Sequence, residues 1–232
     1  MGKQKPILFN GAMVRAILEG KKTQTRRIVK PKYSNTHFES VNGNLWEQEN
    51  VPPPEKLPDG RTRHTVAAAI VRHPEYNVGD ILYIRETFIP WEKLAWDIQQ
   101  WLERNGKKAN YIYRADIDEN KIAKGWTPSI HMLREATRIF LRVTCVRVER
   151  LQDITEEDAR AEGIKGYFKH KEHGGEWHNS DSAPFVGTCN THFSRVGAYA
   201  ELWDELYAKR GFGWDTNPWV LVYEFERVEE AP

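Results

Sequence analysis

The segment IFLRVTCVRVERL, residues 139–151, has the most regular pattern in the chain. Apolar residues at 139, 141 and 143 alternate with polar residues at 142 and 144, the period of two that is typical of a β-strand with one buried face. The alternation slips by one residue near Cys145 and Val146, and this slip predicts a β-bulge. A β-sheet is therefore the expected core of the fold.

The segments on either side add further strands and a few helices. Thr155 is a suitable N-cap, acidic residues fill the next turn and Gly163 is a suitable C-cap, so residues 155–163 predict a short helix. Similar signals predict strands at 66–71, 81–88, 111–113 and 219–225, and helices at 13–18, 94–104 and 198–209. This order predicts an α+β, mostly-β fold, a compact barrel with short flanking helices rather than an alternating α/β sheet.

Two polar segments interrupt this pattern. Residues 32–65 contain three consecutive prolines at 52–54 and a hairpin signal at Asn42-Gly43. Residues 165–194 are rich in glycine, histidine, serine and asparagine. We expect both segments to be insertions into a single domain that spans residues 1–232.

The charge balance limits the kind of partner. The net charge is only +1, whereas a protein that grips a long phosphate backbone usually carries a strong positive balance. Any basic site must then be local, which favours a nucleoside, a nucleotide or a short single strand. No run approaches the ~18 apolar residues of a membrane-spanning helix, and the N-terminus lacks the features of a signal peptide. We expect a cytoplasmic protein with no membrane partner, monomeric or weakly self-associating.

The segment GKKTQTRR, residues 20–27, is the strongest candidate for a functional site, with four cations and two hydroxyls in eight residues. Gly20 is a suitable C-cap for the helix expected before it, so the cations emerge where the chain turns. Crowded ammonium and guanidinium groups repel one another unless an anion lies among them, which favours a phosphate-bearing ligand. A solvated basic turn is the alternative.

This motif and others along the chain resemble the ASCH domain family, a branch of the PUA-like β-barrel superfamily. The similarity is to the type found in phages and prophages and often labelled morphogenetic, and it covers nearly the whole chain except the polar insertions. A PUA-like barrel, RNA or modified-nucleoside binding (with DNA as a further possibility) and a location in the host cytoplasm are what the resemblance implies. The segments that carry it are 6–9, 20–27, 78–80, 85–87, 128–132, 151–159 and 217–220.

The family motif G-x-K-x-x-E-x-R is matched at Gly20, Lys22 and Arg27, but Thr25 stands where many members carry glutamate. The small bacterial ASCH enzymes that hydrolyse N(4)-acetylcytidine carry threonine at this position. Similarity to them assigns their catalytic lysine, threonine and glutamate to Lys22, Thr25 and Glu162. The expected contacts to ligand or phosphate are Lys21, Arg26, Arg27, Arg85 and His131.

Amide hydrolysis needs a nucleophile, a base and a proton donor for the leaving amine. A lysine base at Lys22 requires a pKa several units below about 10.4. Neighbouring cations and burial lower that pKa, whereas an ionised Glu162 raises it. Lys22 and Thr25 would point to opposite faces of an extended strand, so they converge only if residues 20–25 turn. The alternative is that Thr25 bonds only backbone and that Glu162 only neutralises a basic cleft.

Other residues carry weaker signals. His170, His173, His178, Cys189 and His192 include two pairs with spacings that a zinc site can use, but the ligand types are mixed and the loop lengths match no standard finger. We expect solvated histidines there, with no metal and no cofactor. The remaining expectations are an internal ion pair between Arg85 and Glu86, core packing for Trp126 and a buried thiol at Cys145.

The sequence leaves the activity open between classes. The first possibility is an amidohydrolase that acts on an N(4)-acylated cytidine, and a second enzyme possibility is a ribonuclease that acts on single-stranded RNA. The non-enzymatic rival is a reader that encloses a modified base of RNA or DNA. A phage assembly protein is the weakest reading, because no coiled coil or repeat supports it.

Overall fold

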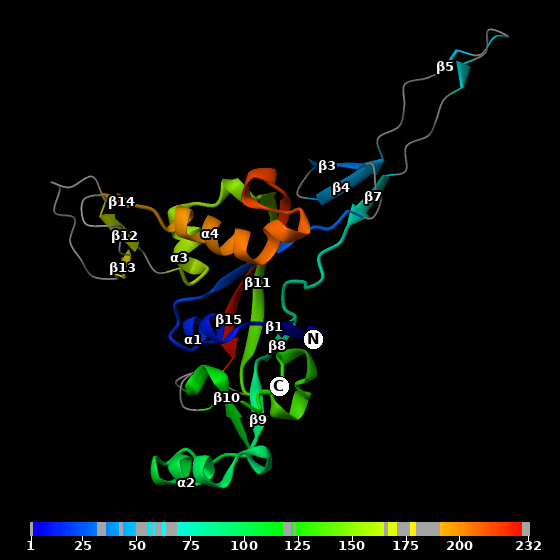
Figure 1. Cartoon of the computed structure of the whole chain (residues 1–232). Helices are drawn as coiled ribbons and strands as arrows, with labels where there is room; N and C mark the ends of the chain where they lie inside the picture. The colour runs from blue at the N-terminus through cyan, green and yellow to red at the C-terminus, as the bar shows by residue number, and fades with distance from the viewer. Residues whose placement is uncertain are drawn as a thin grey trace.

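The computed structural model describes residues 2–31, 36–41, 44–49, 55–56, 58, 62–63, 69–117, 122, 124–164, 167–170, 177–179 and 191–228. A five-stranded sheet lies at its centre, with strand order β1-β8-β11-β15-β2 (Figure 1). The fold is therefore α+β, as the sequence predicts. The strands of this sheet are β1 (Gln4–Leu8), β2 (Gln24–Ile28), β8 (Ile81–Arg85), β11 (Phe140–Arg150) and β15 (Trp219–Val228).

Strand β11 is the predicted strand of residues 139–151, and it pairs antiparallel with β15 along its whole length. The register shifts between Val143 and Cys145, which confirms the predicted bulge. Cys145 itself is a free, half-buried thiol and not the fully buried one expected from the alternation. The bulge leaves it off the fully buried face of the strand.

The two edges of the sheet differ from the expected closed barrel. Within the described residues, strand β1 pairs only with β8, in parallel, and β2 pairs only with β15, antiparallel. Among the described strands no pairing joins β1 to β2, so the hydrogen-bonded sheet is open. Strand β1 was not predicted, because Lys5 and Pro6 interrupt the apolar pattern; an edge position tolerates a proline that donates no hydrogen bond.

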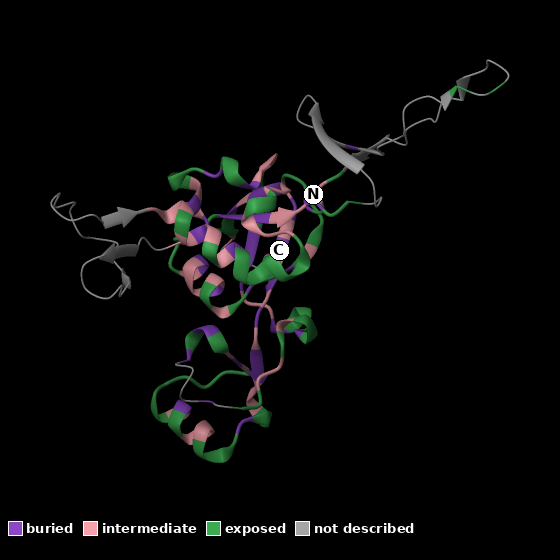
Figure 2. Cartoon of the chain, turned by 45° about the horizontal axis from the view of Figure 1, so that its top comes forward, coloured by how far each residue is buried: buried purple, intermediate pink, exposed green. Residues whose placement is uncertain are grey.

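Strand β15 is buried on both faces, and alternate residues pack against different helices. Leu221, Tyr223 and Phe225 belong to a core shared with helix α1 (Gly11–Leu18), which contributes Val14 and Ile17. The intervening residues face a second core under helix α4 (Arg195–Tyr207) and the short helix α3 (Glu156–Ala161). Buried residues accordingly concentrate in the sheet and under these helices (Figure 2).

A lobe projects from the end of the sheet that lies away from α3 and α4 (Figure 1). It contains β9 (Phe88–Pro90), helix α2 (Trp96–Arg104) and β10 (Tyr111–Tyr113), with its own small apolar core. Trp126 packs on that core and donates from its ring nitrogen to the Ile122 carbonyl at 2.9 Å, so core packing is confirmed for this residue.

The remaining strands lie outside the central sheet, largely within the two polar segments. β3 and β4 pair antiparallel, as the predicted hairpin requires, and β12 lies between β13 and β14. Their bounds are β3 (Thr36–Val41), β4 (Asn44–Glu49), β5 (Glu55–Lys56), β6 (Thr62–Arg63), β7 (Ala69–Arg72), β12 (Tyr167–His170), β13 (Trp177–Asn179) and β14 (Thr191–Phe193). Single 3-10 turns are η1 (Trp91–Lys93), η2 (Arg114–Asp116), η3 (Ser129–His131), η4 (Arg134–Ala136), η5 (Leu151–Asp153), η6 (Ala208–Arg210) and η7 (Trp214–Thr216).

No helix in the described part of the chain has both the length and the apolar character that crossing a membrane requires.

Candidate active site

The basic motif begins with a sharp turn at the end of α1. Gly20 adopts a left-handed conformation with φ 70°, and the N–H groups of Lys21 and Lys22 both donate to the Ala16 carbonyl, at 2.8 and 3.0 Å. This geometry is the glycine C-cap that the sequence predicts. Strand β2 starts only at Gln24. The turn therefore lies at Gly20, before both Lys22 and Thr25, and it is not the turn between these two residues that the sequence analysis requires for their convergence.

A second turn brings Glu162 to the motif. Thr155 caps α3 by accepting from the Asp158 N–H, and the helix ends before Gly163, which has φ 84°. An isolated antiparallel bridge then pairs Lys22 with Glu162. A Cβ on Gly163 would lie 3.1 Å from the Lys22 Cβ and 2.9 Å from the Ala16 Cβ, so the close approach of the two segments depends on glycine.

The bridge places the side chains of Lys22 and Glu162 in contact. Lys22 Nζ donates to Glu162 Oε2 at 2.6 Å and to the Glu162 carbonyl at 3.1 Å, and the two side chains are only 1% and 4% exposed. Burial lowers the pKa of Lys22, and it outweighs the opposing attraction of Glu162; the charges of Arg27 and Arg26 act in the same direction as burial. The ammonium form of Lys22 is thus less favoured than that of an ordinary lysine.

Arg26 holds the other oxygen of the same carboxylate. Its Nη1 lies 3.1 Å from Glu162 Oε1, while Nη2 lies 2.5 Å from Glu149 Oε1 and 3.2 Å from Asp158 Oδ2. The guanidinium is fully buried. Burial alone would lower the pKa of Arg26, but the negative charges of Glu162 and Glu149 raise it above its usual value. Arg26 is a permanent buried cation that fixes the orientation of Glu162.

An outer layer of polar residues surrounds Arg26. Arg147 Nε lies 3.0 Å from Glu149 Oε2, its Nη2 lies 2.7 Å from Asp158 Oδ1, and its Nη1 pairs with Glu224. Burial would raise the pKa of Asp158, but a hydrogen bond from Gln24 and the charges of Arg26 and Arg147 together lower it. The charged groups thus form one connected network from Lys22 to the surface.

The inner end of this network lines a cavity of about 660 Å³ beside the edge strand β2, between α1 and α4. All three predicted catalytic residues line this cavity, and so do three of the five predicted ligand contacts. The lining is partly apolar. The residues that matter here are the polar Lys21, Lys22, Thr25, Arg26, Arg27 and Glu162, and the apolar or aromatic Met13, Tyr199, Leu202 and Leu206.

Strand alternation explains how the motif lines the cavity from both sides of β2. Thr25 pairs with Tyr223, in the core on the α1 side, while Arg26 pairs with Val222 in the core under α4. The Arg26 guanidinium carbon lies 5.9 Å from the Tyr199 ring centroid, a distance typical of a cation–π contact. Because successive strand residues point to opposite faces, an edge strand is the place where both faces can border one cavity.

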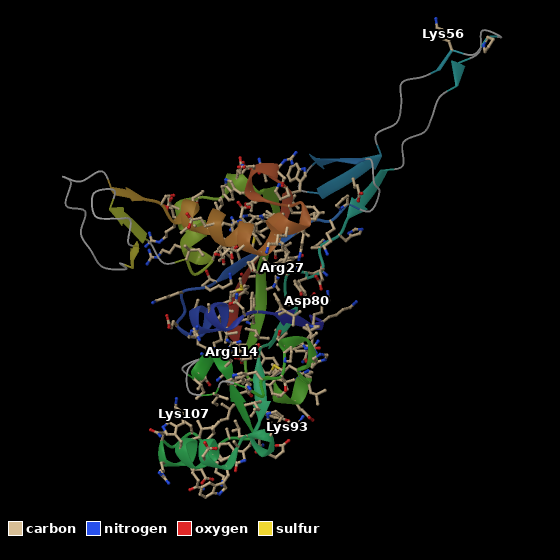
Figure 3. All side chains as sticks on the ribbon, in the orientation of Figure 1. Arg27, Lys56, Asp80, Lys93, Lys107 and Arg114 are labelled. Carbon is tan, nitrogen blue, oxygen red and sulfur yellow. The ribbon has the colours of Figure 1, made fainter. Side chains whose placement is uncertain are left out.

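Arg27 is anchored differently from Arg26. Its Nη2 donates to the Leu8 carbonyl at 3.0 Å, and its guanidinium carbon lies 5.6 Å from the Phe9 ring centroid. Figure 3 labels Arg27 near the centre of the molecule, far from Lys93 and Lys107 in the α2 lobe. Carboxylates of the protein itself neutralise Lys22 and Arg26. For these two residues, the negative partner that the sequence analysis expects to be a phosphate is therefore a side chain of the protein. Phosphate binding at Lys21 and Arg27 stays a prediction.

The other two predicted contacts lie outside this cavity. Arg85 donates to the carbonyls of Met132 (2.9 Å from Nε) and Ile130, so it fastens the 3-10 turn that carries the exposed His131. The predicted Arg85–Glu86 ion pair is wrong. Glu86 pairs instead with Arg138, at 2.8 Å, because neighbouring residues of an extended strand point to opposite sides.

The sequence did not identify the residues that position Glu162. Glu149 and Asp158 contact Arg26 across 123 and 132 positions of sequence, and no local pattern marks such a pair. The one available signal is the spacing of Arg147 and Glu149, which places both charges on one face of the predicted strand. No group of three or more potential metal ligands occurs in the part of the chain that the structure describes. His173 and Cys189 lie outside that part.

The scan of protein-family models found no match to this chain, and the searches of curated proteins and of solved structures likewise found none.

Proposed function

We propose that the chain is an ASCH-type, PUA-like protein whose cavity beside β2 binds a modified nucleoside and hydrolyses its amide, with N(4)-acetylcytidine as the substrate. The observation that carries the proposal is the meeting of Lys22, Thr25 and Glu162 at one buried site, although 137 residues separate Thr25 from Glu162. The mostly-β α+β sheet with the basic motif at the start of its edge strand supports the family assignment.

The cavity suits a nucleoside in size and in lining. Its volume of about 660 Å³ lies within the range of about 300–1,000 Å³ found for small-molecule sites. Met13, Leu202 and Leu206 offer apolar surface to a flat base, and Lys22, Thr25 and Glu162 offer polar groups. Polar groups within a partly apolar cavity fix the orientation of a ligand.

The chemistry assigns one role to each residue. Lys22 rests as the ammonium paired with Glu162, and its lowered pKa makes the neutral form more accessible than in an ordinary lysine. The Thr25 hydroxyl attacks the acyl carbon while this neutral form of Lys22 accepts its proton. Collapse of the tetrahedral intermediate breaks the C–N bond, and the amine of cytidine takes that proton through Glu162. Water then hydrolyses the acyl-threonine ester, which releases acetate and restores the hydroxyl. Arg26 keeps Glu162 in place throughout.

A base reader is the second candidate, and one observation favours it. Lys22 Nζ donates two hydrogen bonds to Glu162, and an ammonium has three donors, so a third can contact a bound base or Thr25. A reader requires only that contact. The two candidates make opposite predictions for a variant that keeps the cavity but lacks the hydroxyl.

The test is incubation of the purified protein with N(4)-acetylcytidine, followed by chromatography for cytidine. Thr25→Val keeps the shape of the side chain and removes the hydroxyl, and Thr144→Val on the exposed side of β11 is the matched control. Hydrolysis by the wild type and Thr144→Val, with retained binding but no turnover in Thr25→Val, supports the enzyme. Binding without hydrolysis by the wild type supports the reader. Absence of binding by the wild type rejects both.

A further inference from the structure

A second cavity, of about 590 Å³, lies on the other side of the Lys22–Glu162 bridge. Lys22 and Glu162 line the first cavity, whereas their chain neighbours Thr23 and Ala161 line the second. Successive residues of an extended segment point to opposite sides, so Lys22 and Thr23 border different spaces, while Ala161 and Glu162 end helix α3. The Thr23 N–H donates to the Ala161 carbonyl at 2.8 Å, so a hydrogen-bonded wall separates the two spaces.

The two cavities meet at one residue that carries a charge. Lys21, Gly163 and Ile164 line both of them. Lys21 has a side chain that is 44% exposed, and its surface partner Glu19 lies 3.1 Å away. A ligand that fills the first cavity can therefore extend past Lys21 into the second.

Among the described residues, the second cavity is lined by three cations and one carboxylate. Arg160 comes from the last turn of α3, Arg195 from the first residue of α4, Lys21 from the basic motif and the carboxylate from Glu157. The first cavity holds the buried ion pairs of Lys22 and Arg26 with Glu162. Guanidinium groups match the geometry of phosphate oxygens, and the Thr23 hydroxyl adds a further donor.

We propose that the second cavity binds the phosphate group of a ligand whose nucleoside occupies the first. The inference deepens the proposed function and depends on it for the identity of the nucleoside, but not for the phosphate. The phosphate belongs either to a free nucleotide or to the backbone of a short RNA. Arg160 and Arg195 are the main contacts and Lys21 bridges the two parts of the ligand.

The first experiment tests the phosphate site without any nucleoside. Inorganic phosphate is titrated into ¹⁵N-labelled full-length protein at constant ionic strength, and the amide signals of Lys21, Thr23 and Gly163 are followed. We expect saturable shifts, and we expect Arg160→Glu to weaken the apparent affinity by about tenfold or more, since losing a charge-assisted contact has roughly that effect. Lys93→Glu, an exposed change in the α2 lobe (Figure 3), is the matched control and leaves the titration unchanged.

Shifts that do not saturate, or that Arg160→Glu leaves unaltered, overturn the proposal. Arg160→Gln accompanies the charge reversal, and thermal unfolding of both variants separates loss of the site from loss of the fold. Because Arg160 is exposed, both variants are expected to fold.

The second experiment compares N(4)-acetylcytidine, its 5′-monophosphate and an RNA trinucleotide that contains it at the centre, by calorimetry. Tighter binding of the monophosphate by about tenfold, lost in Arg160→Glu, supports a nucleotide; a gain only for the trinucleotide supports RNA. Saturable phosphate binding without nucleoside binding rejects the proposed function and leaves the phosphate site standing. Nucleoside binding with no gain from phosphate overturns the phosphate site and leaves the proposed function standing.

Discussion

Lys22 Nζ and Glu162 Oε2 lie 2.6 Å apart in a site that water hardly reaches, and 140 residues of sequence separate them. Each partner lies beside a turn made by a left-handed glycine, Gly20 before Lys22 and Gly163 after Glu162. Arg26 binds the second oxygen of the carboxylate. The same contacts that hold the two segments together thus set the charge and the orientation of the candidate catalytic groups.

Glu162→Gln removes the charge from the centre of this arrangement. Two buried cations, Lys22 and Arg26, then face a neutral amide, and breaking a buried ion pair costs about 3–5 kcal/mol. We expect the free energy of unfolding in urea to fall by that amount. Glu226→Gln, which breaks an exposed pair with Arg142, should cost less than about 1 kcal/mol. Equal losses in the two variants would contradict a special role for the buried pair.

The losses of stability caused by substitutions at Lys22 and at Glu162 are expected to be non-additive. Each single variant leaves one charged side chain of the pair without its partner, whereas Lys22→Met combined with Glu162→Gln removes both charges. The double variant should therefore lose less stability than the sum of the two single losses, by about 0.5–3 kcal/mol. Strict additivity would show that the two side chains do not interact in solution.

Gly163→Ala tests the close approach of the two segments. The new Cβ adds about 1–2 kcal/mol of backbone strain at φ 84° and also meets Ala16 and Lys22. Gly211→Ala is the matched control, because Gly211 has φ 81° but nothing lies within 4 Å of its added Cβ. We expect a larger loss of stability at Gly163, measured by thermal unfolding, by the additional ~1–3 kcal/mol of overpacking. A loss no greater than that of Gly211→Ala would mean that the contact relaxes freely.

Arg147→Gln tests the outer layer of the network. Arg147 joins Glu149, Asp158 and Glu224, two of which bind Arg26 in turn. We expect a loss of about 1–3 kcal/mol, because Glu149 and Asp158 then lose a charged partner. Arg142→Gln on the same strand removes one exposed pair and should change stability by less than about 1 kcal/mol. Similar results for both would place Arg147 outside the network.

Local signals explain what the sequence predicts well. The Thr155 cap, the turn glycines at 20 and 163 and the alternation of 139–151 are each encoded within a few residues, and the structure has all of them. The motif at 20–27 predicts a site for the same reason. The shared cavity of Lys22 and Thr25 depends instead on the edge position of β2, which no local signal predicts.

The contacts that the sequence does not predict depend on pairing between segments far apart in the chain. Arg26 meets Glu149 because β2 and β11 both flank β15, and it meets Asp158 because helix α3 packs on the same side of the sheet. No local pattern contains either arrangement. The predicted ion pair of Arg85 and Glu86 does not form, because residues adjacent in an extended segment place their side chains on opposite sides of the chain. Strand β1 was not predicted because an edge strand that contains a proline has little apolar alternation.

Asp80 provides a test of stability against pH that does not involve the candidate site. Its carboxylate lies 2.9 Å from Lys5 Nζ and accepts the N–H groups of Lys3 and Asn77 at 2.8 and 3.0 Å, which fastens the N-terminal segment to the turn before β8. Burial would raise the pKa of Asp80, but the hydrogen bonds from Lys5 and from these backbone groups lower it to about 2.

A carboxyl whose pKa is lower in the folded state stabilises the fold at pH values above the unfolded pKa of 3.8. That stabilisation should therefore disappear as the pH falls from about 4 to about 2. Thermal unfolding of the wild type between pH 5 and pH 2 should show the loss, and Asp80→Asn, which cannot titrate, should show a smaller dependence over the same window. An equal dependence in the two proteins would assign the acid sensitivity to other carboxylates.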